Sequence, residues 1–235
     1  MGEHKCQFDL QRLASQCGKK RRQLPITGAY TWSKSIDNSS GFYDQIDPYN
    51  PRVSRGLSTF DVTHNFVVSY SYNLPLAKSV SGAKGRLLSG WTITGITRFT
   101  TGFPVTITES SDDHSLCGCT GADVPNYNGQ RIRIVNPRSG NYFDTSPFSA
   151  EALGTTGNSD RRFFHGPGIN NWDFALHKTT QITEKQILEF RAEFFNIFNH
   201  AQFYNVQGNF NATNFGQATQ ARDPRIGQLA LKFSF

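Results

Sequence analysis

The chain has 235 residues, a formal net charge of +6 and 37% hydrophobic residues, yet 13% of its residues are aromatic. No run of about 18 apolar residues occurs, which excludes a transmembrane helix. A membrane β-barrel stays open as a class, because barrel strands alternate between apolar and polar residues and never form such a run.

The first part of the chain, residues 1–24, has no strand-like alternation and no apolar core of a secretory signal. Its basic cluster, residues 19–22, is the densest in the chain. Nucleic-acid binding would require a basic face or a recognised motif, so we expect no nucleic-acid partner. We expect residues 1–24 to be disordered or out of frame, as in a truncated or frame-shifted gene, and residues 25–235 to form the structured part.

Strand-type alternation of apolar and polar residues marks six segments of the chain. Such alternation puts the two kinds of residue on opposite faces of a strand. The fifth segment also suits an amphipathic helix, but Arg191 would then lie among Phe190, Phe194 and Phe198, so we expect a strand there as well. The six segments are residues 26–34, 62–75, 91–104, 171–178, 188–198 and 226–235.

The connections between these segments alternate in length. Residues 35–60, 108–168 and 198–222 form long loops, residues 74–90 a medium turn and residues 179–185 a tight turn. This rhythm is typical of outer-membrane barrels, which have short periplasmic turns and long external loops. A soluble β-sandwich is the alternative, but long structureless loops inside a compact domain argue against it.

Aromatic residues lie near the ends of the strands on the apolar face. In a membrane barrel, residues at such positions form girdles at the two membrane–water interfaces. In a sandwich they would be ordinary core residues. The residues that we assign to the girdles are Trp32, Tyr70, Tyr72, Trp91 and Trp172.

Charged residues lie on the opposite, polar face of the same strands. In a barrel they would point into the lumen, either along a substrate path or as a charge ladder that stiffens the inner wall. We favour the ladder. The candidates are Arg98, Asp173, His177, Glu189, Arg191 and Glu193.

The loop at residues 109–129 is acidic and rich in glycine, and it contains Cys117 and Cys119. These cysteines, together with Cys6 and Cys17, lack the spacing of a four-ligand zinc site, so a disulfide or free thiols are favoured over a metal. We expect a solvated loop, although ligand or ion binding there is the alternative. No nucleophile motif occurs, and we expect no enzyme activity, no metal and no cofactor.

Several stretches together resemble the C-terminal barrel of TonB-dependent outer-membrane transporters, in particular the Oar-like branch. They occur in the family's order and cover the chain from about Ile26 to Phe235. The stretches are "GAYTWSKSIDN", "HNFVVSYSYNLP", "SGWTITGITRFTTGFPVTI", "NYFDTSPFSAEALGTTGNSDRRFFHGPGINNWDFALHK", "LEFRAEFFNIFNHAQF" and "DPRIGQLALKFSF".

The resemblance implies an antiparallel up-and-down membrane β-barrel section, the last six strands of a barrel of about 22 strands whose lumen is plugged. It implies an outer-membrane location and active uptake of a bulky substrate whose identity the sequence does not reveal. The implied partners are outer-membrane lipid, the barrel-assembly machinery, the N-terminal plug and other strands, and the TonB complex.

The resemblance also explains the patterned C-terminus. The final strand would be the signal read by the assembly machinery, through Leu229, Leu231, Phe233 and Phe235. Six strands alone are too few to close a membrane barrel. We therefore expect a section of a transporter that is not competent alone. The alternatives are a small stand-alone outer-membrane or adhesive β protein, and a product that is inactive and degraded.

Overall fold

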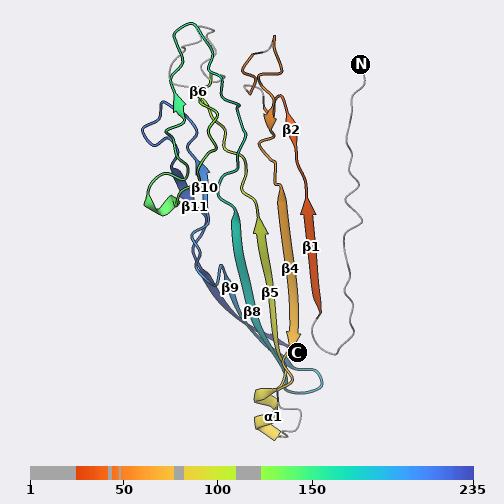
Figure 1. Cartoon of the computed structure of the whole chain (residues 1–235). Coiled ribbons are helices and arrows are strands. Elements are labelled where there is room, and N and C mark those ends of the chain that lie inside the picture. Colours follow the sequence, from red (N-terminus) through yellow and green to blue (C-terminus); the bar gives the residue numbers. More distant parts are fainter. Residues whose placement is uncertain (1–24, 42–43, 48, 77–81, 110–122) are drawn as a thin grey trace, which may run out of the picture.

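The computed structural model describes residues 25–41, 44–47, 49–76, 82–109 and 123–235. The segment 1–24 and all four cysteines lie outside these ranges. The six expected segments form one antiparallel sheet in which each strand pairs with its neighbour in the list (Figure 1). Its strands are β1 (Ile26–Trp32), β4 (His64–Asn73), β5 (Trp91–Thr100), β8 (Ile169–Gln181), β9 (Ile187–Phe195) and β12 (Ile226–Ser234).

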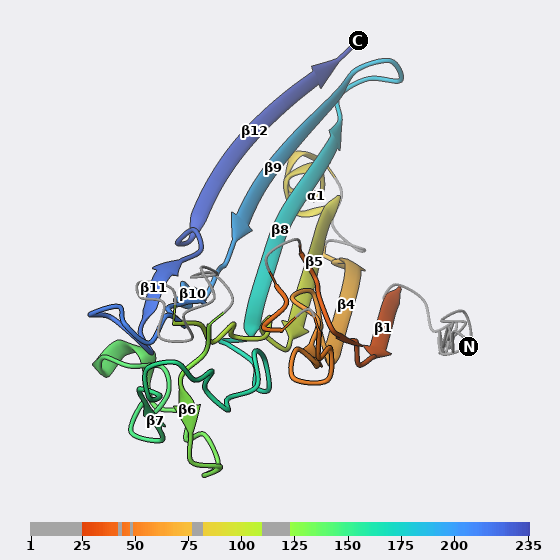
Figure 2. The ribbon, with the colours of Figure 1, turned by 90° about the horizontal axis from the view of Figure 1, so that it is seen from above.

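This order confirms the predicted all-β, up-and-down arrangement. The fifth segment is the strand β9 over Ile187–Phe195, so alternation outweighed its helix-forming composition. A neighbouring strand on each side, β8 and β12, supplies the backbone partners that favour the extended form. The strands slant progressively from β1 to β12, which is the usual twist of a sheet (Figures 1 and 2).

The strand register brings the apolar sides of all six strands to one face of the sheet. One row of directly opposite residues runs from Ile26 through Tyr70, Gly95, Phe174 and Phe194 to Gly227. Opposite residues in an antiparallel pair share a face, so the alternation read along each strand is continued across the sheet. We call this side the apolar face and the other side the polar face.

Gly95 has a specific role in the middle of the apolar face. A Cβ atom at this position would lie 2.4 Å from the ring of Tyr70, which is its partner across β4 and β5. The tyrosine ring therefore covers the glycine backbone directly. A larger residue at position 95 would push this ring away from the sheet.

The two ends of the sheet are built differently. At the lower end lie helix α1 (Gly82–Leu88), the turn after β8 and the end of β12, whereas long connections gather at the upper end (Figure 1). Gly90 leads from α1 into β5 with a φ of +75°, a backbone conformation that glycine adopts without strain. No helix in the described ranges has the length and apolar character needed to span a membrane.

The upper connections contain short elements that the sequence patterns did not predict. Three two-stranded sheets form there, each within or between the long loops, together with one turn of 3-10 helix, η1 (Pro137–Ser139). The strand pairs are β2 (Ile36–Asp37) with β3 (Gly56–Leu57), β6 (Asn126–Tyr127) with β7 (Phe148–Ser149), and β10 (Phe203–Val206) with β11 (Ala218–Ala221).

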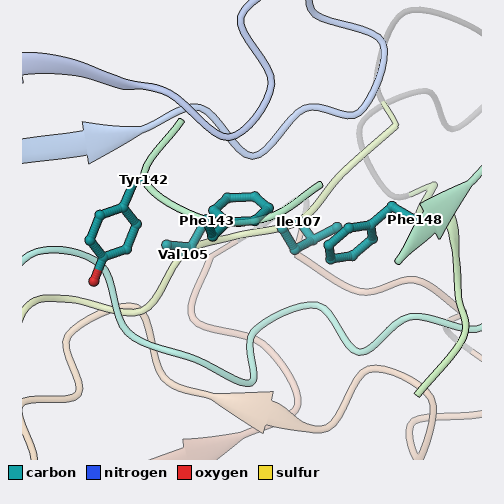
Figure 3. Packing of buried hydrophobic residues seen from close by; sticks show 5 residues of the cluster. All are labelled: Val105, Ile107, Tyr142, Phe143 and Phe148. Atoms are coloured by element: carbon teal, nitrogen blue, oxygen red, sulfur yellow. The ribbon is translucent and has the colours of Figure 1, made fainter. Parts of the chain in front are cut away.

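A hydrophobic core lies within these upper connections, not within the sheet. Its buried members are Val105, Ile107, Tyr142, Phe143 and Phe148, and Figure 3 shows them side by side. Phe143 contacts Phe148 edge-on at a centroid distance of 6.0 Å, and further phenylalanines from the loops pack around them. We refer to the folded connections at the upper end as the loop layer.

Of the loop at residues 109–129, which we expected to be solvated, the structure describes residues 109 and 123–129. The prediction is wrong for residues 109 and 123–125, which are buried, whereas residues 128 and 129 are exposed. Glu109, Asp123 and Val124 are all at most 1% exposed. The backbone amide of Glu109 donates to the carbonyl of Asp123 at 2.8 Å, which joins the two ends. They are buried because the loop layer packs around them. Cys117, Cys119 and the rest of residues 110–122 lie outside the described ranges.

Candidate functional site

The charged residues predicted for one face do lie on the polar face, but they fall into two groups. The register aligns His177 with Arg191, and Glu193 with Gln228. These residues, with Glu189, occupy the middle and lower part of the face. Arg98 and Asp173 lie at its upper end, where the loop layer begins.

The lower group forms a ladder of polar contacts along β9 and across to neighbouring strands. The Nε atom of Arg191 donates to Oε1 of Glu189 at 2.7 Å, and His177 Nε2 lies 3.1 Å from the Thr94 hydroxyl. The Gln228 side chain donates to the carboxylate of Glu193. Because each charge already has a polar neighbour, this arrangement suits a stiffening ladder better than a ligand site.

Two hollows lie at the upper end of the polar face; Arg98 lines both of them and Asp173 lines the smaller one. The smaller hollow, about 400 Å³, has its floor on β5, β8, β9 and β12 and is bordered by Arg222 and Asp223 from the connection before β12. The larger one, about 870 Å³, lies between the hairpin β10–β11 and the segment that follows β5. Arg98, Ile169 and Arg222 line both. We call the larger hollow the upper groove.

Close backbone approaches hold the walls of the upper groove together. A Cβ atom on Gly208 would lie 1.8 Å from the carbonyl oxygen of Thr106, and one on Gly102 would lie 2.2 Å from that of Gly166. Only glycine fits where two backbones meet this closely. The Gly208 contact positions the β10–β11 hairpin beside the segment that follows β5, and the Gly102 contact joins that segment to the one before β8.

A buried ionic cluster ties the first long loop to the segment before β8. Arg162 donates to both carboxylate oxygens of Asp44, at 3.0 and 2.6 Å, and to the carbonyl of Leu57 at 2.6 Å. Arg161 contacts Asp37 at 3.0 Å and Asp44 at 2.9 Å. The Arg162 side chain is fully buried, so these partners are needed to neutralise it. We did not predict this cluster from the sequence, although its two arginines are adjacent in the "DRR" stretch at residues 160–162.

The electrostatics of this cluster follow from its geometry. Burial alone would raise the pKa of Asp44, but the Arg162 hydrogen bond, the Ser40 amide and the charges of Arg162 and Arg161 hold it below the ordinary value of 3.8. Nearby, burial raises the pKa of Tyr142 to about 12. Its phenol therefore stays protonated and donates to the backbone oxygen of His165 at 3.1 Å.

The residues assigned to the aromatic girdles lie on the apolar face. Trp32 and Trp172 are near its upper end, and Tyr72 and Trp91 are near its lower end. Tyr70 instead lies over Gly95 in the central row. An upper aromatic row that pattern reading did not single out crosses three strands, with Phe99 packed edge-on against Trp172 at 5.7 Å and beside Phe66 at 6.4 Å.

Lys178 is an exception on the apolar face, at its lower end. Its ammonium lies 4.9 Å from the centre of the Trp91 ring. It also donates to the carbonyls of Arg86, Leu87 and Ser89 at 3.1, 2.7 and 2.9 Å. The charge is therefore held by the C-terminal carbonyls of α1, where a cation interacts favourably with the helix end.

The terminal strand carries its alternating apolar residues on the same face. Leu229, Leu231 and Phe233 lie opposite Ala192, Phe190 and Leu188 of β9. They are 73%, 69% and 49% exposed, and Phe235, just after the strand, is 94% exposed. The rings of Phe233 and Phe235 stack at 5.9 Å. Their role in assembly stays a prediction.

Four polar contributors were not singled out from the sequence, for two different reasons. Gln228 and Lys232 alternate with the apolar residues of β12, so the period of two would have assigned them to the polar face. Arg222 and Asp223 lie in an irregular connection, where no periodicity indicates direction. Within the described ranges, no three histidine, cysteine or acidic side chains gather as a metal site.

Comparison with known proteins agrees with this architecture. The model of a family described as "Outer membrane beta barrel domain" matches residues 14–228, which is more than half of the chain. No curated protein and no solved structure matches the chain significantly. The six-stranded antiparallel sheet, with one apolar and one polar face, is the kind of wall that such a domain requires. The chain therefore belongs to the outer membrane beta barrel domain family.

Proposed function

We propose that the sheet is the C-terminal wall of a TonB-dependent outer-membrane transporter of the Oar-like branch, which takes up a bulky substrate. The observation that carries the proposal is the apolar face. Five of its six strands have 9, 10 or 13 residues. About 9 to 11 residues are enough for a tilted strand to cross a bilayer.

The distribution of burial supports a lipid-facing sheet. Nine hydrophobic residues are buried in the described ranges, and Ala192 is the one that belongs to the six-stranded sheet. Large apolar residues of the sheet, such as Trp32 at 63% and Leu229 at 73%, remain exposed. In water such a surface would aggregate, whereas in hydrocarbon it is the expected outer surface of a barrel.

The sheet also requires further strands. β1 and β12 are its two edges, with one neighbour each among the described strands. Bare strand edges are not tolerated in lipid, and membrane barrels need about eight strands or more. A large plugged barrel supplies these strands on both sides, and the polar ladder of the inner face would then lie against the plug.

A small stand-alone outer-membrane or adhesive protein is the second candidate. The loop layer favours it, because this layer has its own hydrophobic core and would present a rigid outer surface without a transport function. The barrel would then be closed by strands from additional copies of the chain. The mass of the particle in detergent separates the two candidates, since copies of one chain give a multiple of 26.3 kDa.

The test of the transport proposal combines gene sequence and uptake. DNA upstream of the codon for Met1 should encode a plug, a TonB box and further strands that belong to the same product. Uptake of a candidate substrate should occur in cells with TonB and stop in cells without it. Outer-membrane fractionation is the control for correct location. If the protein reaches the outer membrane and uptake is the same without TonB, the proposal fails.

A further inference from the structure

The upper groove contains two arginines, Arg98 and Arg222, that have no acidic partner among the residues that the structure describes. Arg98 comes from the upper end of β5 and Arg222 from the connection after β11, and both line the groove. Across the described ranges, neither guanidinium has an acidic oxygen within 4.0 Å. The guanidinium of Arg222 lies 5.3 Å from the centre of the Tyr204 ring, which fixes its orientation toward the groove wall.

The other arginines that we have described are all paired. Arg161 and Arg162 contact aspartates in the buried cluster, and Arg191 contacts Glu189. This contrast matters because the chain has acidic residues available nearby. Asp173 lines the smaller hollow, where its carboxylate accepts hydrogen bonds from Asn171 and from the backbone amide of Asn196, at 2.9 and 3.0 Å. Among the described residues, the positive charge of the groove therefore has no acidic partner, although an acidic side chain lies in the neighbouring hollow.

The rest of the described lining of the upper groove combines apolar side chains, such as Phe103 and Val206, with hydrogen-bonding groups. None of its described lining residues is an aspartate or a glutamate. Hydroxyl and amide groups come from side chains such as Thr100, Thr106, Asn205, Gln207 and Gln220. A volume of about 870 Å³ is within the range of sites that bind ligands of a few hundred daltons.

We propose that the upper groove binds the carboxylate groups of an organic acid ligand through Arg98 and Arg222. A guanidinium matches a carboxylate because its N–H groups donate two parallel hydrogen bonds to the two oxygens. The hydroxyl and amide groups of the lining hold the uncharged part of the ligand. This inference rests on the proposed uptake function, for which it names the chemical class of the substrate: a small polycarboxylate, either an acidic oligosaccharide or an acidic peptide fragment.

Binding measured on the full 235-residue chain in detergent micelles tests the proposal. The probes are two matched pairs: trigalacturonate with its methyl ester, and triglutamate with triglutamine. Each pair differs in charge while the backbone stays the same. We expect at least one acid to bind about tenfold more tightly than its neutral partner, and added salt to reduce this difference. Which acid binds identifies the scaffold.

Substitutions separate the groove from general positive charge. Arg98→Gln and Arg222→Gln should each weaken binding of the acid by about tenfold and leave the neutral partner unchanged. The matched control is Arg138→Gln, on an exposed side chain outside both hollows. Arg222→Lys should restore part of the affinity, because it keeps the charge but loses the two-pronged hydrogen bonds.

The outcomes that overturn the proposal are distinct from failure of the transport function. The proposal is wrong if neither acid binds, if neutral partners bind equally well, or if the two Gln variants bind the acid as the unsubstituted chain does. Circular dichroism of each variant verifies that the fold is retained. Uptake that does not depend on TonB would refute the transport mechanism while leaving the binding result intact.

Discussion

The six-stranded sheet and the loop layer above it treat their apolar side chains in opposite ways. The loop layer encloses Ile107 and Phe143, both 0% exposed, within protein. The sheet leaves the side chains of Leu229 and Leu231 exposed, at 73% and 69%. The loop layer therefore contains its own stabilising core, whereas the apolar face of the sheet depends on its surroundings.

This contrast explains how one chain serves two environments. Burial of apolar surface is the main favourable term in folding, and the loop layer obtains it from the packing of its aromatic and aliphatic side chains. The sheet obtains it when its apolar face enters lipid. The two regions should consequently respond to different perturbations, and four experiments, ordered by expected effect, test this independence.

The largest effect should follow from a cavity in the loop layer. Phe143→Ala removes a fully buried ring at the centre of this core and should destabilise the loop layer by about 3–5 kcal/mol. Hydrogen exchange followed by mass spectrometry should show faster exchange in the loops and unchanged protection in the sheet. Leu153→Ala, at a position that is 71% exposed, is the control. Equal loss of protection in the sheet would mean that the two regions unfold together.

Breaking the ionic cluster should have a slightly smaller effect. Arg162→Met leaves the carboxylate of Asp44 without its two-pronged partner, which should cost about 3 kcal/mol, at the low end for a buried pair because Asp44 is 16% exposed. Limited proteolysis should then cut the first long loop more readily. Arg138→Met, at an exposed site, should leave the cleavage pattern unchanged. Resistance of the Arg162 variant would refute a clamping role for this cluster.

A charge on the apolar face should disturb the sheet and spare the loop layer. Phe174→Arg, in the central row of the apolar face, should destabilise the membrane-inserted form by about 2–3 kcal/mol. Ala175→Arg, its neighbour on the polar face, should cost much less, because the strand alternates between faces. Urea titration of vesicle-inserted protein measures both. If Ala175→Arg is the more damaging change, the assignment of faces is reversed.

The smallest expected effect is a change in the stability of the loop layer at acidic pH. The pKa of Asp44 lies below 3.8 in the folded chain, whereas an aspartate in the unfolded chain has a pKa of about 3.9. The ionised carboxylate therefore stabilises the folded chain. This stability is fully present above the unfolded pKa and is lost as the pH falls through the folded pKa. The difference in loop-layer stability between the native chain and Asp44→Asn should therefore shrink below about pH 4. Thermal scans from pH 6 to pH 3 measure it. A difference that stays constant across these scans would exclude this linkage.

The sheet was largely predictable because its signal is local. Alternation in "LALKFSF" and "LEFRAEFF" reflects one strand with one wet and one apolar side, and this information lies within each segment. The positions of the strands, their chain-order pairing and the polar-face position of Arg191 follow from such patterns and from short turns. The strand ends do not: β8 continues to Gln181, into the expected tight turn at 179–185, and β9 ends at Phe195 instead of residue 198. We assigned Tyr70 to a girdle from the alternation along its own strand. Its position over Gly95 depends on the register with β5, which that alternation does not reveal.

The loop layer was not predictable from the same reasoning. Its core joins Val105, Tyr142 and Phe148 from irregular segments that have no period, so no pattern indicates which side chains turn inward. The partners of Arg162 and the meeting of Arg98 with Arg222 at one groove depend on contacts between distant parts of the chain. Loop conformation is set by packing and by paired polar groups rather than by local propensity.

The sequence by itself determined where the strands lie and which of their sides is apolar, because a period of two is a property of neighbouring residues. Only the tertiary structure decided that the loops fold into a layer with a core of their own, and that Arg98 and Arg222 meet in one groove whose described lining holds no acidic residue. Both features arise where segments far apart in the chain come into contact, so the pattern of neighbouring residues does not reveal them.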